Sequence, residues 1–160
     1  MKFLTAFTRL SIISVGKARH TSEVRQLEVT RKTEYAISAL IELAKHPGKY
    51  VSSKTIAEKQ DIPKNFLPQI IALLGSHGWV AGLRGPGGGV RLEADPATIA
   101  VKDVIELIEG EIAVARCLSD KVVCSKEGEC PLQPVWREAQ TAFLTVLQRF
   151  TIADLVENTP

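Results

Sequence analysis

The feature that most restricts the fold of this 160-residue chain is the hexapeptide Arg84–Gly89. Five of its six residues are glycine or proline, so no regular helix can cross it. The segments on either side, Trp79–Leu83 and Val90–Leu92, are short and apolar and have strand character. The sequence therefore predicts a β-hairpin with a glycine-rich tip and an arginine, Arg84, at its base.

A phosphate-binding loop is the alternative interpretation of these glycines. Such a loop needs the sequence Gly-Lys-Ser/Thr followed directly by a helix. Here a strand follows the glycines, and no Lys-Ser/Thr pair is present. The nucleotide-binding interpretation is therefore weak.

A first helix is predicted over residues 30–45, where apolar residues recur at intervals of three and four. Thr30 can cap its start, and His46-Pro47-Gly48 contains helix-breaking residues at its end. Its buried face is expected to contain Ile37, Leu40, Ile41 and Ala44.

Two further helices are predicted before the hairpin. One covers residues 54–59 and is capped by Ser52 or Ser53, and the next covers residues 63–76 with a proline at its favourable first position. Pro68 lacks an N–H group, so it is tolerated only near the start of that helix and can bend it. Two helices joined by a short turn form either a helix-turn-helix or an ordinary helical pair. The hairpin that follows them favours a winged helix-turn-helix.

The second half of the chain contains two more helical patterns. One lies around residues 101–109 and ends at Gly110, and the other runs over residues 131–150, after which Thr151 caps a short final helix. In the long helix, apolar residues alternate at spacings of four and three, the coiled-coil period. They are Leu132, Trp136, Ala139, Phe143, Val146 and Phe150. This seam either packs on its own domain or forms a dimer interface, and we favour the dimer.

All three cysteines of the protein, Cys117, Cys124 and Cys130, lie between these two helices, separated by six and five residues. Three soft thiolate donors suit an iron–sulfur cluster, zinc or copper(I). A disulfide framework would need an even number of cysteines. Two alternatives remain: a thiol-redox switch, and a structural zinc site in an interaction protein that binds no DNA. Zinc sites usually have closer Cys pairs than these.

Charge is distributed unevenly along the chain, although the net formal charge is only +2. Residues 1–26 contain five Lys or Arg and one acid, residues 27–92 contain nine and five, and residues 93–160 contain six and twelve. The basic first half is a candidate surface for a polyanion, and the alternative is a solvated charge imbalance. We find no nucleophile–base pair or metal-hydrolase motif, so an enzyme is not expected.

The first 25 residues are rich in Lys, Arg, Ser and Thr and have no acid before Glu23, which resembles an amphipathic transit peptide. A secretory signal is disfavoured because Arg9 interrupts the apolar run. We favour a dispensable tail or an early assigned start, and expect residues 1–26 to be poorly ordered. No stretch approaches the roughly 20 apolar residues of a membrane span.

Together these segments resemble the IscR/NsrR-type winged-helix transcription regulators of bacteria. The resemblance covers about residues 27–156, and the order and separation of its parts make it specific. The matching segments are Leu27–Ala36 (opening helix), Asn65–Ile70 (recognition helix), Arg84–Gly89 (wing), the cysteine loop followed by Val135–Glu138, and Thr151–Leu155 (closing turn).

The resemblance implies a homodimer that binds a palindromic operator in double-stranded DNA and carries one iron–sulfur cluster per subunit, [2Fe-2S] or [4Fe-4S]. The lack of a secretion signal fits a reducing cytoplasm, where three free thiolates survive. Cys117, Cys124 and Cys130 match the three cysteine ligands of the family. IscR-like members space these cysteines five and five, and use a histidine where this chain has Gln133. Other members use an acidic residue from the first helix of the partner subunit, and Glu34 occupies that position here. The resemblance therefore makes Glu34 the candidate fourth ligand, and the alternative is a solvated charge on the helix.

The expected fold is mainly α-helical, with a small β-hairpin wing. Its parts in chain order are an N-terminal extension (1–26), the winged helix-turn-helix domain (27–92), a connecting helix (93–116), the cysteine loop (117–130), and a dimerisation helix with a C-terminal turn (131–160). A cluster would order the polar cysteine loop and, if the fourth ligand comes from the first helix of the partner subunit, would also fix the angle between the two DNA-binding heads.

DNA contacts are expected on the basic half of the chain. Phosphate contacts fix the register of a protein on DNA, whereas base contacts read the sequence. The expected phosphate contacts are Arg31, Lys32, Ser53 and Lys54. Lys64, Asn65 and Gln69 are expected to reach bases in the major groove, and Arg84 the minor groove. The alternative for each is plain solvent exposure. Phe66 and Trp79 are expected in the core.

Overall fold

The computed structural model describes residues 29–119 and 129–158, so the predictions for residues 1–26 and for Cys124 lie outside the described residues. The described N-terminal half consists of three helices and an antiparallel hairpin: α1 (Arg31–Ala44), α2 (Ser53–Lys59), α3 (Leu67–Ser76), β1 (Val80–Leu83) and β2 (Gly89–Leu92). The C-terminal half contains α4 (Val101–Glu109), α5 (Gln133–Arg149) and α6 (Ile152–Glu157), with short 3₁₀ turns η1 (Pro96–Thr98) and η2 (Arg116–Leu118). The predicted fold class, mainly α-helical with a hairpin wing, is confirmed.

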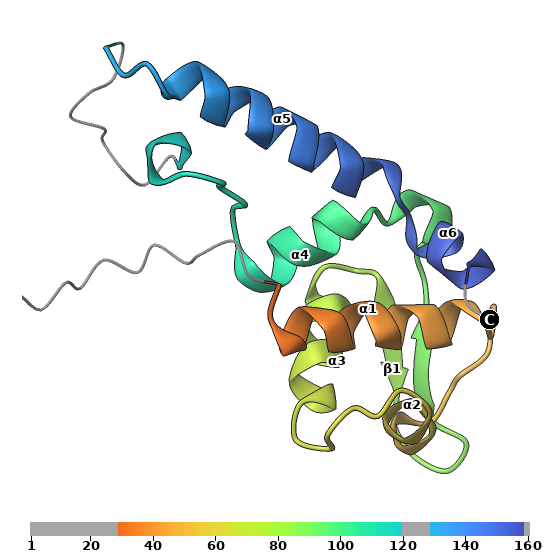
Figure 1. The fold of residues 1–160 in the computed structure, drawn as a ribbon. Helices are drawn as coiled ribbons and strands as arrows, with labels where there is room; N and C mark the ends of the chain where they lie inside the picture. Colours follow the sequence, from red (N-terminus) through yellow and green to blue (C-terminus); the bar gives the residue numbers. More distant parts are fainter. Residues whose placement is uncertain (1–28, 120–128, 159–160) are drawn as a thin grey trace, which may run out of the picture.

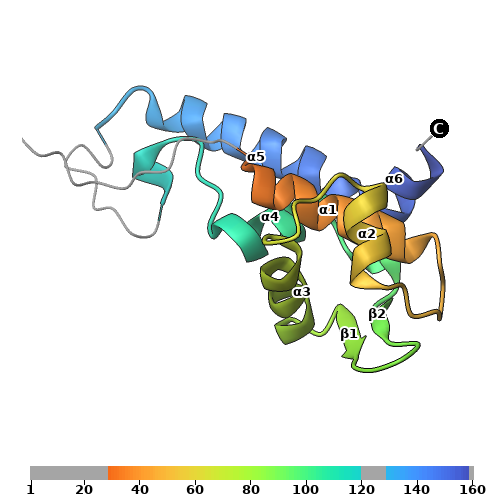
Figure 2. The same cartoon turned by 90° about the horizontal axis from the view of Figure 1, so that it is seen from below.

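Helix α1 is the central element, because it contacts α2, α3, α4, α6 and β2. Helix α5 lies on one side of α1, and α3 and the wing lie on the other (Figure 1 and Figure 2). Among the described residues, no helix combines the length and apolar composition that crossing a membrane requires.

The buried face of α1 differs from the predicted one. Ala36, Ala39, Leu40 and Leu43 have no exposed area. Of the four residues predicted to be buried, only Leu40 is fully buried, and the other three are partly exposed. The small alanines allow neighbouring elements to approach the helix closely, so the contact centres on them rather than on the larger isoleucines.

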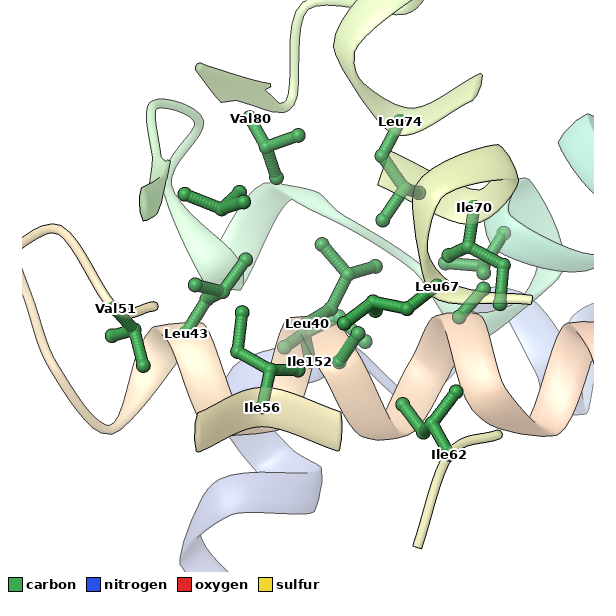
Figure 3. Close-up of a cluster of buried hydrophobic side chains, with 14 of the residues drawn as sticks. Leu40, Leu43, Val51, Ile56, Ile62, Leu67, Ile70, Leu74, Val80 and Ile152 are labelled. Carbon is green, nitrogen blue, oxygen red and sulfur yellow. The ribbon is translucent and has the colours of Figure 1, made fainter. Parts of the chain in front are cut away.

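One apolar cluster holds the two halves of the chain together. Figure 3 shows Leu40 and Leu43 of α1 surrounded by Ile56 of α2, side chains of α3, and Ile152 of α6. Ile152 has no exposed area, although it lies near the C-terminal end of the described chain. A backbone bridge between Ala100 and Thr151 fixes the same region, with N···O distances of 2.9 Å for both Val101–Phe150 and Ile152–Ile99.

Helix α3 begins at Leu67, and the prediction that it starts near Pro63 is wrong. Residues 64–66 form a turn, in which the Phe66 N–H donates to the Pro63 carbonyl at 2.9 Å. A helix starting at Pro63 would need an N–H from Pro68, which proline lacks. With the start at Leu67, Pro68 falls in the first turn, where no such bond is needed.

The hairpin pairs Val80 with Leu92 and Leu83 with Gly89. Val51, which precedes α2, adds a third short segment, because it exchanges two hydrogen bonds of 2.8 Å with Val90. At Gly89 a Cβ atom would lie 2.3 Å from the Val51 carbonyl oxygen. Glycine is therefore needed at position 89 to let the two backbones approach.

We expect Gly89→Ala to lower the free energy of unfolding by about 1–3 kcal/mol, because the added methyl must displace the Val51 carbonyl. The matched control is Gly82→Ala in the opposite strand, where a Cβ atom meets nothing within 4 Å. Urea denaturation of both variants checks this. Equal losses in the two variants would contradict the role given to the Val51 contact.

A buried carboxylate joins α1 to the end of α2. Glu42 is 2% exposed and accepts hydrogen bonds from Lys59 Nζ at 2.8 Å and Gln60 Nε2 at 3.1 Å. Burial alone would raise the pKa of Glu42, but the bonds from Lys59 and Gln60, with the nearby charge of His46, lower the pKa below 4.5 overall. This cluster fixes the end of α2 and hence the turn that leads to α3.

Because the pKa of Glu42 is lower in the folded than in the unfolded state, the carboxylate stabilises the fold above about pH 4.5, and this contribution is lost as the pH falls through the folded-state pKa. Glu42→Gln is expected to lower the free energy of unfolding by about 1–3 kcal/mol at neutral pH. In acid, where Glu42 of the wild type is protonated, the two proteins should approach the same stability. Urea midpoints measured as a function of pH test this. The control is Glu58→Gln, at an exposed ion pair of 3.9 Å with Lys54, expected to cost less than about 1 kcal/mol.

Candidate DNA-binding face and cysteine site

The polar residues expected to read bases lie together at the start of α3. Lys64 and Asn65 are in the turn before the helix, Gln69 is in its first turn, and all three are exposed. Beneath them, Leu67 and Ile70 are buried in the core. The buried face of α3 therefore leaves Gln69 on the exposed side of the helix, and the turn before the helix leaves Lys64 and Asn65 exposed beside it.

The start of α2 is exposed as well. Ser52 is the residue that caps it, accepting a hydrogen bond of 3.0 Å from the Thr55 N–H. Ser53 and Lys54, expected at phosphates, follow in the first turn and are exposed. Amide groups at a helix start favour an anion nearby.

The wing presents Arg84 immediately after β1, where it is exposed. Its neighbour Leu83 is 50% exposed. Arg91 of β2 was not among the residues expected to contact DNA, and its Nε and Nη2 donate to Glu93 Oε1 at 2.8 and 2.6 Å. The Arg91 guanidinium also lies 5.0 Å from the centroid of the Tyr50 ring. This arginine is held against the protein by its neighbours.

Phe66 was predicted to lie in the core, and this is wrong, because its side chain is 36% exposed. Its ring meets Tyr35 of α1 edge-on, with centroids 5.8 Å apart. Phe66 immediately precedes α3 and so falls outside the buried stripe of that helix. The sequence offered no local signal for this, because the helix was predicted to start near Pro63 and so to include Phe66. Trp79 is partly buried, with its ring 4.5 Å from that of His77.

The start of α1 carries residues with two different expected roles. Arg31 Nη1 donates to Glu34 Oε2 at 2.9 Å, so the expected phosphate contact and the expected fourth ligand form one ion pair. Both side chains are largely in solvent, at 80% and 50% exposed. Lys32 is partly buried. An exposed ion pair of this kind is weak, so it leaves both groups available to other partners.

The hydroxyl of Thr30 does not cap α1 as predicted, because it donates to Glu109 at the end of α4. Glu109 Oε1 also accepts from the Thr30 N–H at 3.3 Å and from the buried Thr33 hydroxyl at 2.6 Å. A carboxylate at a helix N-terminus is favoured by the helix dipole. Through these bonds, the end of α4 fixes the start of α1.

Two of the three cysteines belong to the described residues. Cys117 lies in the η2 turn and Cys130 lies just before α5, and both are free, partly buried thiols. Among residues 29–119 and 129–158, no group of three or more His, Cys, Asp or Glu side chains is arranged to hold a metal. Three thiols on one segment are nevertheless the donor chemistry of iron–sulfur clusters.

A helix-turn-helix followed by a hairpin wing, with polar residues at the start of its second helix, defines a winged-helix DNA-binding protein. Comparison with known families takes this one step further. The family Rrf2, described as "Iron-dependent Transcriptional regulator", matches residues 29–158. The chain belongs to the Rrf2 family of transcriptional regulators.

Named relatives agree with this assignment. The HTH-type transcriptional regulator NsrR of Bacillus subtilis (strain 168) is 38% identical over 134 residues, which cover 82% of this chain and 92% of that protein. IscR of Sodalis glossinidius (strain morsitans) is 35% identical over 133 residues, covering 82% and 80%. These relatives are transcriptional regulators and not enzymes, as the sequence analysis expected.

Solved structures show the same fold. CymR, the global cysteine regulator of B. subtilis, is 30% identical with a TM-score of 0.69, covering 84% of this chain and 100% of that chain. The oxidised form of CymR from Staphylococcus aureus is 29% identical with a TM-score of 0.65, covering 83% and 98%.

Proposed function

We propose that the protein is a cytoplasmic transcription regulator whose affinity for operator DNA is controlled by an iron–sulfur cluster bound by Cys117, Cys124 and Cys130. The observation that carries this proposal is the position of all three cysteines on one segment between α4 and α5 of a winged-helix regulator. Membership of a family described as iron-dependent supports iron as the metal. The cluster is either [2Fe-2S] or [4Fe-4S].

Glu34 of the partner subunit is the proposed fourth ligand. Support comes from its exposure near the start of α1 and from its weak pairing with Arg31, which a stronger acceptor can replace. Gln133, which stands where some members have a histidine, is a neutral amide and a poor iron ligand. A bound cluster supplies an inorganic group whose redox state and iron ligation respond to the cell.

Homodimerisation through α5 completes the proposed molecule. Helix α5 has no fully buried residue in the single chain, and most of its coiled-coil seam is exposed: Leu132 52%, Trp136 37%, Val146 49% and Phe150 38%, with Phe143 partly buried. Covering this seam with a second copy removes a large apolar surface from water. A two-fold dimer in turn matches a palindromic operator.

In the DNA complex, Lys64, Asn65 and Gln69 are proposed to contact base edges and Arg84 to enter the minor groove. Arg31, Lys32, Ser53 and Lys54 are proposed to contact phosphates.

A route from the cysteines to this DNA-binding face is available in the chain. Cys117 follows α4, Glu109 at the end of α4 bonds to Thr30 and Thr33, and α1 contacts α3. A change in the conformation of the cysteine segment can therefore alter the position of α3 through α4 and α1.

A thiol-redox regulator without a cluster is the second candidate. The fold similarity to CymR, of which an oxidised form is known, favours it, as do the free, partly exposed thiols of Cys117 and Cys130. This candidate uses the same DNA-binding face and the same cysteines. The two candidates differ only in whether iron and sulfide are bound.

Protein purified without oxygen is expected to be coloured and to contain iron and acid-labile sulfide, and Cys124→Ala is expected to lose all three. Absorption spectra with iron and sulfide assays on the same samples test this. Glu34→Ala should shorten the lifetime of the colour, whereas the matched control Glu58→Ala should not. If the wild-type protein stays colourless after anaerobic reconstitution, the cluster proposal is wrong, and the thiol-redox regulator remains as the proposed function.

Duplexes selected from a random-sequence pool by the full chain are expected to be palindromic, with half-sites roughly 34–36 Å apart. Gln69→Ala should relax the preference at one base pair by about 1–3 kcal/mol. Lys54→Ala should weaken binding to all sequences and reduce the salt slope by about 1. Arg137→Ala, on α5, is the control and should change neither. Selection of unrelated sequences would contradict the proposed base contacts.

A further inference from the structure

The side chain of Gln140, on α5, makes two hydrogen bonds to the backbone of the segment that leads to Cys117. Its Nε2 donates to the Ile112 carbonyl at 2.5 Å, and its Oε1 accepts from the Val114 N–H at 2.8 Å. Gln140 thus holds this segment at two backbone groups, the Ile112 carbonyl and the Val114 N–H.

This clamp is close to Cys117 in the chain. Only two residues separate Val114 from Cys117, which lies in the η2 turn. The ends of this short region are also joined, because Ser119 Oγ donates to Glu111 Oε2 at 3.1 Å. The thiol of Cys117 therefore sits on a compact loop that Gln140 attaches to α5.

Cys130 is attached to the same helix. The N–H of Gln133, the first residue of α5, donates to the Cys130 carbonyl at 3.1 Å. Gln133 and Gln140 are seven residues apart, so they lie on one face of α5, two turns or roughly 10 Å apart along the axis. Helix α5 thus sets the distance between the anchoring points of the first and last cysteines.

We infer that Gln140 is a positioning residue for the cysteine site: its amide holds residues 112–114 on α5 and so fixes Cys117 relative to Cys130. Both polar atoms of the amide are used in this clamp, so Gln140 acts through the backbone and is not itself a ligand. The identity of the bound group rests on the proposed function, whereas the placement of Cys117 is a property of the chain alone.

Docking of α5 does not depend on this amide. The backbone bridge between Ala100 and Thr151 anchors the far end of α5, and α5 also contacts α4. Loss of the amide should therefore release the loop of Cys117 while leaving the helices in place. Partners that orient metal ligands in this indirect way typically change metal affinity by about 10–100-fold when removed.

The test uses Gln140→Met, which keeps the length of the side chain but has no amide. Its matched control is Gln148→Met, at an exposed position of the same helix. The reduced, metal-free full chain is alkylated with iodoacetamide without oxygen and digested with trypsin. Cleavage after Arg116, Lys121, Lys126 and Arg137 puts each cysteine in its own peptide, so mass spectrometry gives three separate rates.

In Gln140→Met, Cys117 is expected to react several-fold faster than in the wild type, because its loop opens more often, while the rate at Cys130 stays the same. A cobalt(II) titration, followed by thiolate-to-metal absorption, should show an affinity lower by about 10-fold or more. The control variant should match the wild type in both measurements.

Unchanged Cys117 reactivity and unchanged cobalt(II) affinity in a folded Gln140→Met would overturn the inference, and so would an equal rise in the rates of Cys117 and Cys130. If circular dichroism shows that this variant is unfolded, Gln140→Glu replaces it. Glutamate keeps the acceptor for Val114 and loses the donor to Ile112, so a smaller rise at Cys117 is expected. If the wild type binds neither cobalt(II) nor iron, the proposed function fails, and the alkylation rates still decide the role of Gln140.

Discussion

The packing of α1 is the contact on which the rest of the structure depends. Ala36, Ala39, Leu40 and Leu43 are completely buried, and elements from both halves of the chain meet on this helix. Leu and Ala side chains in such a position contribute mainly by removing apolar surface from water. Since α3 and α4 both contact α1, the candidate DNA-binding face and the segment that follows α4 and contains the cysteines are supported by the same helix (Figure 1).

Polar side chains then connect α1 and its neighbouring helices to the candidate DNA-binding face and to the cysteine segment. Hydrogen bonds of Glu42 join α1 to the end of α2, those of Glu109 join the start of α1 to α4, and those of Gln140 join residues 112–114, before Cys117, to α5. Each of these bonds joins residues at least 17 positions apart in the sequence. Partly buried hydrogen bonds of this kind contribute modestly to stability, and here they join segments that are distant in the sequence.

Much of the fold could be predicted because local patterns determined it. Glycines fixed the hairpin, and Thr151 formed the predicted cap of α6 with Asp154. The exposed start of α3 also followed from pattern, but its first residue did not, because Pro68 shifted the helix start to Leu67. The bonds of Glu109 and Gln140 could not be predicted, since each depends on how distant helices pack. Phe66 was misplaced because aromatic residues are usually buried and only the packed helix reveals which face it occupies.

The burial of Ile152 in the cluster around α1 has a consequence for biosynthesis (Figure 3). Helices α1–α3 and the hairpin are synthesised before α6, but their common core lacks the side chain of Ile152 until that residue has been made. Domains generally fold as units while the chain is being synthesised. For this protein, the core around α1 reaches its final packing only after Ile152 has been synthesised, so the cysteine segment is already present when the candidate DNA-binding face is complete.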